Sequence, residues 1–168
     1  MAIRELLTFP NPVNEKAARV VAGGVLLLGI LTLVTGWRWL LALIALGFLA
    51  RVLAGPRFSV LGQLATRAIA PRLGPAKLVP GPPKRFAQAI GLTLTTVAAV
   101  AALGFGATVL PVVLLGVLLV FAFLESVVGF CAGCWVFGHL MRLGIIPEET
   151  CEACNNIWGR QEAQAPAR

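Results

Sequence analysis

The residues with the clearest chemical potential are four cysteines, which occur as two closely spaced pairs. Cys131 and Cys134 form the first pair and Cys151 and Cys154 the second, in the pattern C-x2-C-x16-C-x2-C. Isolated cysteines commonly serve as small buried hydrophobic residues, but every cysteine of this chain belongs to a pair. The spacing therefore indicates chemistry at sulfur, either ligation of a metal or reaction of thiols.

The first interpretation is a tetrathiolate zinc site. Two C-x2-C pairs separated by about 15–20 residues are typical of zinc sites, and a closed four-thiolate site is structural rather than catalytic. In zinc knuckles a glycine often follows the second cysteine, whereas Trp135 and Asn155 follow it here. Asn155 can adopt the left-handed conformation that such a turn uses, but Trp135 cannot do so cheaply.

The second interpretation is thiol chemistry, either dithiol–disulfide exchange or the carriage of sulfur as a persulfide. The reactive species is the thiolate, which is favoured at a helix N-terminus or beside a cation. Gly129 and Gly133 favour a break in the helix near Cys131, and a break would place the thiols at a new helix N-terminus. His139 and Arg142 follow and could supply positive charge, although a single histidine in this apolar run is more often an interfacial residue.

The elements that must position these thiols are strongly apolar. The 168 residues are 58% hydrophobic and 12% charged, with a mean hydropathy of +0.89. A soluble domain carries about 25% charged residues, so this composition excludes a soluble globular enzyme, a disordered tail and a small secreted disulfide scaffold. The chain has no Asp, no Tyr and one His. These features leave a membrane protein with few types of catalytic side chain.

Four stretches are long and apolar enough to cross the hydrocarbon layer, for which a helix needs about 20 residues. They cover residues 17–35, 37–53, 86–110 and 111–130. We therefore expect an all-α integral membrane four-helix bundle. Its membrane domain would cover residues 1–146 and its cysteine-containing tail residues 147–168.

Positive charge is concentrated between the second and third of these spans. Residues 55–85 hold six Lys and Arg residues and no acid, whereas the two short connections hold only Arg38. Because positively charged loops stay in the cytoplasm, we expect this loop and both termini to face the cytoplasm of a bacterial cell. Cytosolic thiols are kept reduced, which argues against permanent structural disulfides.

The basic loop has internal order. Apolar residues between 60 and 69 fall on one helical face, which predicts an interfacial amphipathic helix on the cytoplasmic membrane surface. Five prolines between Pro71 and Pro83 predict a stiff, extended connector. The basic side chains suit anionic lipid headgroups, and no set of aromatic residues accompanies them that would indicate binding to nucleic acid.

Arg51 and Glu125 are the two ionisable residues expected well inside the spans, where such residues are functional candidates. Both are expected at a similar depth, so an ion pair joining the second and fourth spans is the structural interpretation. The functional alternative is that Glu125 accepts a proton near the dithiol. On a straight helix Glu125 and Cys131 would point about 120° apart, so direct contact requires a bend.

Three stretches of the chain resemble a known family of bacterial membrane proteins. They are residues 55–59, 80–88 and 125–134, with the sequences GPRFS, PGPPKRFAQ and ESVVGFCAGC. Together they resemble the family catalogued as domain of unknown function 4395, from about Val13 to Cys134. The resemblance implies an integral membrane protein without a settled activity. It also implies genome neighbours of the thioredoxin-like and sulfurtransferase types, which favour sulfur chemistry over zinc.

The sequence thus predicts a membrane-edge dithiol that exchanges electrons or sulfur with a cytosolic thioredoxin-like or sulfurtransferase partner. Cys131 and Cys134 are the expected reactive pair, with Glu125 as the acid–base group and Cys151 and Cys154 as resolving thiols or a second pair. The alternative is a structural membrane protein in which zinc, held by the four cysteines, folds the tail. A transporter or channel subunit is disfavoured because the spans offer little polar lining.

Overall fold

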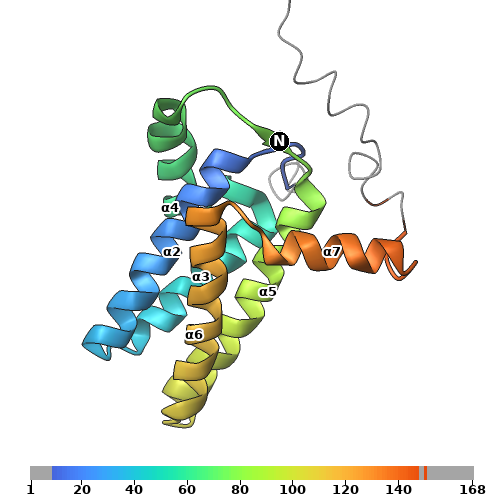
Figure 1. Cartoon of the computed structure of the whole chain (residues 1–168). Coiled ribbons are helices and arrows are strands. Elements are labelled where there is room, and N and C mark those ends of the chain that lie inside the picture. The colour runs from blue at the N-terminus through green and yellow to red at the C-terminus, as the bar shows by residue number, and fades with distance from the viewer. Residues whose placement is uncertain (1–8, 148–149, 151–168) are drawn as a thin grey trace, which may run out of the picture.

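The computed structural model describes residues 9–147 and residue 150, and this part of the chain is almost entirely helical. Four long helices form a bundle: α2 (Glu15–Thr35), α3 (Trp39–Ala54), α5 (Gly81–Ala99) and α6 (Val109–Phe123) (Figure 1). π-Helical turns extend α5 through η4 (Val100–Gly104) and α6 through η5 (Leu124–Val128). Four helical segments are long and apolar enough to cross a membrane. The expected all-α membrane bundle is thus confirmed.

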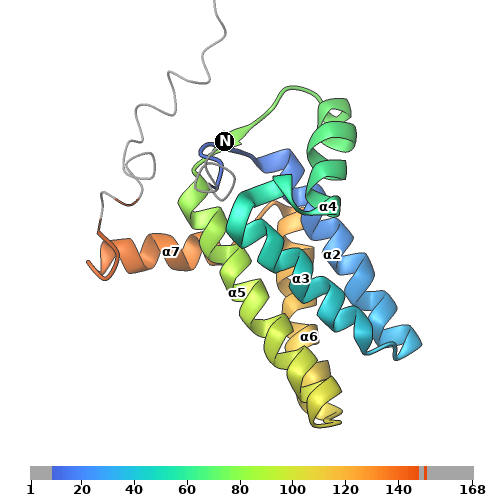
Figure 2. The same cartoon turned by 180° about the vertical axis from the view of Figure 1, so that it is seen from behind.

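The core of the bundle is built from small and branched apolar side chains. Gly91 of α5 lies directly against the ring of Phe48, so that α3 and α5 approach closely, as Figure 2 shows. In membranes such small residues allow helices to pack without a hydrophobic driving force. The buried cluster around Phe48 draws side chains from all four long helices and from η4: Val25, Leu41, Ile44, Ala98, Ala102, Leu115, Leu118 and Ala122.

The bundle has one nearly uncharged end. Here Gly36 closes α2 in the left-handed conformation, and Trp37 stacks on Trp39 with ring centroids 6.0 Å apart. Arg38 donates to the carbonyl oxygens of Ala102 and Gly106. Indole rings prefer the interface between lipid and water, so this end has the features of a membrane boundary.

The opposite end carries the basic connection between α3 and α5. It forms short helical turns: η1 (Gly55–Arg57), α4 (Val60–Gln63), η2 (Leu64–Ile69) and η3 (Ala70–Leu73). Ala65 and Ala70 are buried against α2. The segment predicted to be amphipathic is therefore helical, but Val60 and Leu64 of its apolar face remain 87% and 51% exposed. Its location on a membrane surface stays a prediction.

The proline-rich connector is shorter than the extended segment predicted from Pro71 to Pro83, because α5 already begins within it. Its strand β2 (Leu78–Val79) pairs antiparallel with β1 (Val13–Asn14), and α5 begins at Gly81 rather than at residue 86. Pro82 and Pro83 lie in the first turn of α5, where proline lacks only an N–H that the helix leaves free. This earlier start places Lys84 on the helix.

The fourth long helix ends where the glycines favour a break. Gly129 has a φ of 79° and closes η5 in the left-handed conformation. A separate helix, α7 (Ala132–Arg142), then leaves the bundle crosswise (Figure 1). Phe137 and Met141 of α7 are buried and pack against Phe86 of α5. The break therefore gives the chain a short helix that starts at the first cysteine pair.

Candidate functional site

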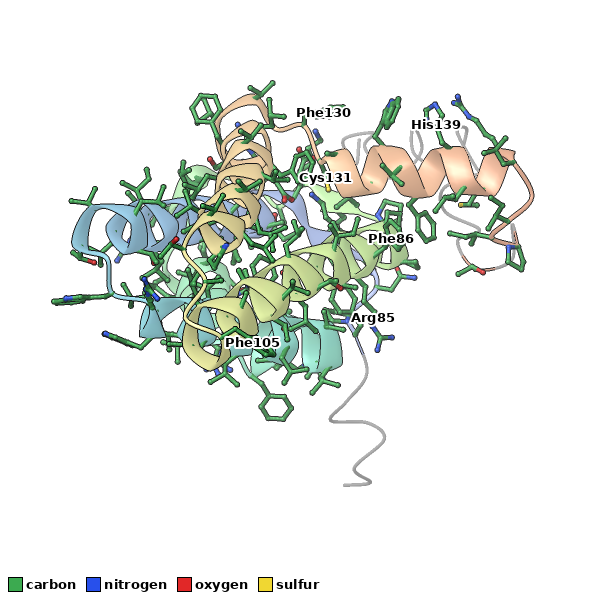
Figure 3. All side chains as sticks on the ribbon, turned by 90° about the horizontal axis from the view of Figure 1, so that it is seen from below. Arg85, Phe86, Phe105, Phe130, Cys131 and His139 are labelled. Atoms are coloured by element: carbon green, nitrogen blue, oxygen red, sulfur yellow. The ribbon has the colours of Figure 1, made fainter. Side chains whose placement is uncertain are left out.

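The first cysteine pair lies at the start of α7. Cys131 is the N-cap residue of this helix and has an extended backbone, and its sulfur accepts a hydrogen bond from the backbone N–H of Cys134 at 3.4 Å. Figure 3 shows Cys131 at this junction, with Phe86 of α5 beside α7. Cys131 occupies the position where an N-cap side chain accepts from a free helix N–H.

The two sulfurs of the pair are in direct contact. The thiol of Cys134 donates a hydrogen bond to the sulfur of Cys131, and the two Sγ atoms are 2.7 Å apart. Both cysteines are free and half-buried. The α7 start therefore orients both side chains toward each other, so that a bond between the two sulfurs needs only a small movement.

The two thiols differ in acidity. The hydrogen bond from the Cys134 thiol lowers the pKa of Cys131 below its usual value, with help from the nearby Lys84 ammonium and the Cys134 backbone N–H. The pKa of Cys134 is raised, because its proton is shared with Cys131 and because burial and the negative charge of Cys131 oppose its ionisation. Cys131 is thus the thiol that ionises first.

A buried ion pair lies next to the dithiol. Lys84 Nζ of α5 and Glu125 Oε1 of η5 are 2.6 Å apart, and their side chains are 9% and 14% exposed. The charges of both residues act on the two cysteines. The ion pair therefore joins the start of α5 to the end of the fourth long helix and places opposite charges beside the thiols.

The expected ion pair between Arg51 and Glu125 is wrong. Arg51 is 5% exposed, but its Nε donates to Gln88 Oε1 at 2.8 Å and its Nη1 to Ser59 Oγ at 3.1 Å. Its guanidinium also lies over the Phe48 ring, and Nη2 is buried without a hydrogen-bond partner. Glu125 pairs instead with Lys84, because the early start of α5 brings that side chain inside the bundle.

Lys84 and Gln88 are the functional candidates that the sequence analysis missed. They are four residues apart on α5 and therefore share one helical face. Pro82 and Pro83 are the signal that could have revealed them, because prolines are favoured in the first turn of a helix. If α5 is taken to begin at Gly81, Lys84 and Gln88 both lie on this helix, at the basic end of the bundle.

The other candidate residues lie apart from the thiols or outside the described residues. His139 stacks on Trp135 with ring centroids 4.0 Å apart, and its Nδ1 lies 3.0 Å from the Trp135 carbonyl oxygen. The cation whose charge acts on the cysteines is Lys84 rather than His139 or Arg142. Cys151 and Cys154 lie outside the described residues. Within residues 9–147, no group of three or more His, Cys, Asp or Glu side chains could hold a metal.

Two pockets border the dithiol. The outer pocket, of about 400 Å³, lies at the basic end and is lined by Glu15, Lys84, Cys131, Cys134 and Trp135 together with neighbouring Pro and Gly residues. The inner pocket, of about 100 Å³, lies among the long helices and includes Gln88, Glu125 and Cys131 in its otherwise apolar lining. The dithiol therefore lies between the basic end and the interior of the bundle.

These features define a helical bundle of the membrane-spanning type with a dithiol at one end. The chain matches the family model described as "Domain of unknown function (DUF4395)" over residues 13–142, and it belongs to this family. The resemblance is thereby confirmed. The matched region contains Cys131 and Cys134 and ends before Cys151 and Cys154. Comparison with curated proteins and with solved structures gave no match.

The acidity of Cys131 is expected to depend on the donor at position 134. In a chain that carries Cys151→Ser and Cys154→Ser, Cys134→Ser keeps a hydroxyl donor, whereas Cys134→Ala removes the donor. We expect the alkylation rate of Cys131 with iodoacetamide to show a higher apparent pKa in the alanine variant, because the thiolate loses its main stabilising contact. Mass spectrometry of samples quenched between pH 5 and pH 10 measures this rate. Identical pH profiles for the two variants would contradict the assignment.

The Lys84–Glu125 pair is expected to stabilise the bundle only as a pair. Lys84→Met and Glu125→Gln should each lower the free energy of unfolding by about 3 kcal/mol, because each leaves one buried charge without its partner. The double variant should lose clearly less than the sum of the two losses. Denaturant titration in detergent micelles measures these free energies.

The chain offers a matched control for this comparison of single and double variants. Lys77 and Glu15 form a second ion pair of 2.7 Å, but the Lys77 side chain is 58% exposed. Lys77→Met should therefore lower the free energy of unfolding by less than about 1 kcal/mol. Equal losses for Lys77→Met and Lys84→Met would show that burial does not set the strength of the inner pair.

Proposed function

We propose that this chain is a membrane-embedded dithiol–disulfide oxidoreductase whose Cys131–Cys134 pair exchanges electrons with a soluble partner. The observation that carries the proposal is the N-cap position of Cys131, whose sulfur accepts the thiol proton of Cys134 at 2.7 Å. A thiolate at a helix N-terminus beside a cation is the reactive form of such pairs. The presence of this pair within the family match supports the proposal.

The exchange runs in two steps that conserve electrons. The Cys131 thiolate attacks one sulfur of a partner disulfide, forms a mixed disulfide and releases the first partner thiolate. The Cys134 thiolate then attacks the sulfur of Cys131, which forms the internal disulfide and releases the second partner thiolate. The two electrons of the dithiol thus reduce the partner, and the reverse sequence oxidises it.

The two different thiol acidities suit these two steps. The lowered pKa of Cys131 supplies the attacking thiolate, and the raised pKa of Cys134 keeps the second thiol protonated until the mixed disulfide forms. Loss of the negative charge on Cys131 then removes one cause of the raised pKa of Cys134. Glu125 is the carboxylate whose charge acts on both thiols, and we assign it as acceptor of the Cys134 proton, with Lys84 holding it in place.

The outer pocket is the proposed place of exchange with the partner. It borders both cysteines and lies beside the exposed indole of Trp135, which is 56% exposed. A thioredoxin-like or sulfurtransferase protein would present its own sulfur there. The mouth of this pocket faces the basic end of the bundle rather than the nearly uncharged end.

We further propose that the basic end faces the cytoplasm. Arg57, Arg67 and Arg72 lie in the connection at this end, whereas Arg38 is the single charged residue of the connections at the opposite end within residues 9–147. Positive residues favour the cytoplasmic side. A fluorescent protein fused after residue 168 should therefore fluoresce, and alkaline phosphatase fused there should stay inactive. An active phosphatase fusion would reverse the orientation.

The function is tested by trapping the mixed disulfide. In a chain that carries Cys151→Ser and Cys154→Ser, with glutathione disulfide as oxidant, the Cys134→Ser variant should stop at one glutathione per chain on Cys131, because no resolving thiol is left. Cys131→Ser should acquire no glutathione at this pair. The matched control is the double variant Cys151→Ser/Cys154→Ser, which should still form the internal disulfide. Mass spectrometry after digestion counts each product.

The zinc interpretation gives the opposite result on the same samples. Anaerobically purified protein would then hold about one zinc per chain, and its thiols would react only after chelation. Each of the four cysteine substitutions would also disorder the tail to the same extent. Such a result would overturn the redox proposal, whereas metal-free protein with a reversibly oxidised Cys131–Cys134 pair supports it.

A further inference from the structure

The inner pocket lies among the membrane-spanning helices, directly beside Cys131. It is bounded by α2, α3, α5 and α6 and by the first residues of α7. Its walls are mainly apolar, including Val25, Phe48 and Leu118 of the core. Phe121 and Val136 also line it and are 40% and 36% exposed. The pocket therefore has an apolar interior and a rim on the outer surface of the bundle.

Cys131 is the one residue that lines both the inner and the outer pocket among the described residues. Cys134 borders only the outer pocket. A cysteine that borders two separate pockets is placed to meet two different molecules in turn. The outer molecule would be the soluble partner, and the inner molecule would have to enter from the lipid.

The Lys84–Glu125 pair joins the same two pockets. Lys84 lines the outer pocket, Glu125 lines the inner pocket, and their side chains meet at 2.6 Å. Protons can therefore pass from the basic end to the inner pocket through this ion pair, while electrons pass through Cys131. An apolar molecule that takes up both electrons and protons is the chemical class that matches this arrangement.

We propose that the inner pocket binds the ring of a membrane quinone, which oxidises the Cys131–Cys134 dithiol. This inference rests on the proposed thiol exchange and names its lipid-soluble reaction partner. The pocket volume of about 100 Å³ is smaller than an apolar cavity of about 150 Å³ that binds benzene. The pocket would therefore enclose only part of the ring, and the rest would lie at the exposed rim beside Phe121 and Val136. An isoprenoid tail would leave past Phe121 and Val136 into the lipid.

The reaction is balanced in electrons and protons. The sulfurs of Cys131 and Cys134 form one S–S bond and give up two electrons, and the two quinone carbonyl oxygens become the hydroxyl groups of a quinol. One proton comes from the Cys134 thiol. The other comes from water at the outer pocket and passes through Lys84 and Glu125. The soluble partner's dithiol then reduces the new disulfide, so that electrons flow from the partner to the quinone.

The test uses the full chain in lipid nanodiscs, reduced and freed of reductant without oxygen. Decylubiquinone is added, and quinone loss is followed by absorbance while free thiols are counted. We expect one quinol for each two thiols lost at the Cys131–Cys134 pair, with a rate that saturates as the quinone concentration rises. A chain with Cys151→Ser and Cys154→Ser should give the same stoichiometry.

Filling the pocket should separate quinone reduction from thiol exchange. Ala122→Leu places a larger side chain in the inner pocket and should lower the rate with decylubiquinone by about tenfold or more, the effect of a 1.4 kcal/mol loss. Val120→Leu is the matched control, because Val120 is 57% exposed and does not line the pocket. Ala22→Val fills the pocket from α2 and serves if Ala122→Leu does not fold.

The readouts distinguish the two proposals. Exchange with glutathione disulfide at the outer pocket should be the same in Ala122→Leu, Val120→Leu and the parent chain. If this exchange occurs but no quinol forms, or if filling the pocket leaves the quinone rate unchanged, the quinone proposal is wrong and the exchange proposal stands. If neither reaction occurs at Cys131 and Cys134, both proposals are wrong.

Discussion

A buried ammonium and a buried carboxylate must meet if an apolar bundle is to hold both. Moving either charge alone out of water costs several kcal/mol, so Lys84 and Glu125 fix the start of α5 against the end of the fourth long helix. The position of α7 depends on this contact, because only three residues separate η5 from the first residue of α7. Gly133 of α7 then lies against Ala87, one turn along α5 from the ion pair. The dithiol geometry therefore follows from how two helix ends are held together.

The turn at Gly129 places the two cysteines of the candidate site beside this ion pair. A continuous helix would carry Glu125 and Cys131 on different faces, and its backbone N–H groups at residue 134 would be bonded within the helix. With the break, residue 129 takes a left-handed conformation that suits glycine. Cys131 becomes a cap residue, and its sulfur receives both the backbone N–H and the thiol of Cys134.

Hydropathy and cysteine spacing predicted much of this arrangement, because both are local properties of the chain. The four spans follow from apolar length, and the break before α7 follows from the glycines around Cys131. The partner of Glu125 could not be predicted in the same way. Arg51 and Lys84 both lie near the basic end, and the choice between them depends on where α5 begins and on the contacts that Gln88 and Ser59 make with the guanidinium.

Arg51 has a consequence for the site although it does not contact the cysteines. Arg51 and Lys84 are both at least nine-tenths buried, and Glu125 is the carboxylate whose charge acts on both of them. This layer of the bundle therefore has a surplus of one positive charge when the cysteines form a disulfide. Reduction to the Cys131 thiolate brings the layer to charge neutrality. An apolar medium magnifies such a difference, so under the proposed thiol exchange this charge balance would favour the reduced pair over the disulfide.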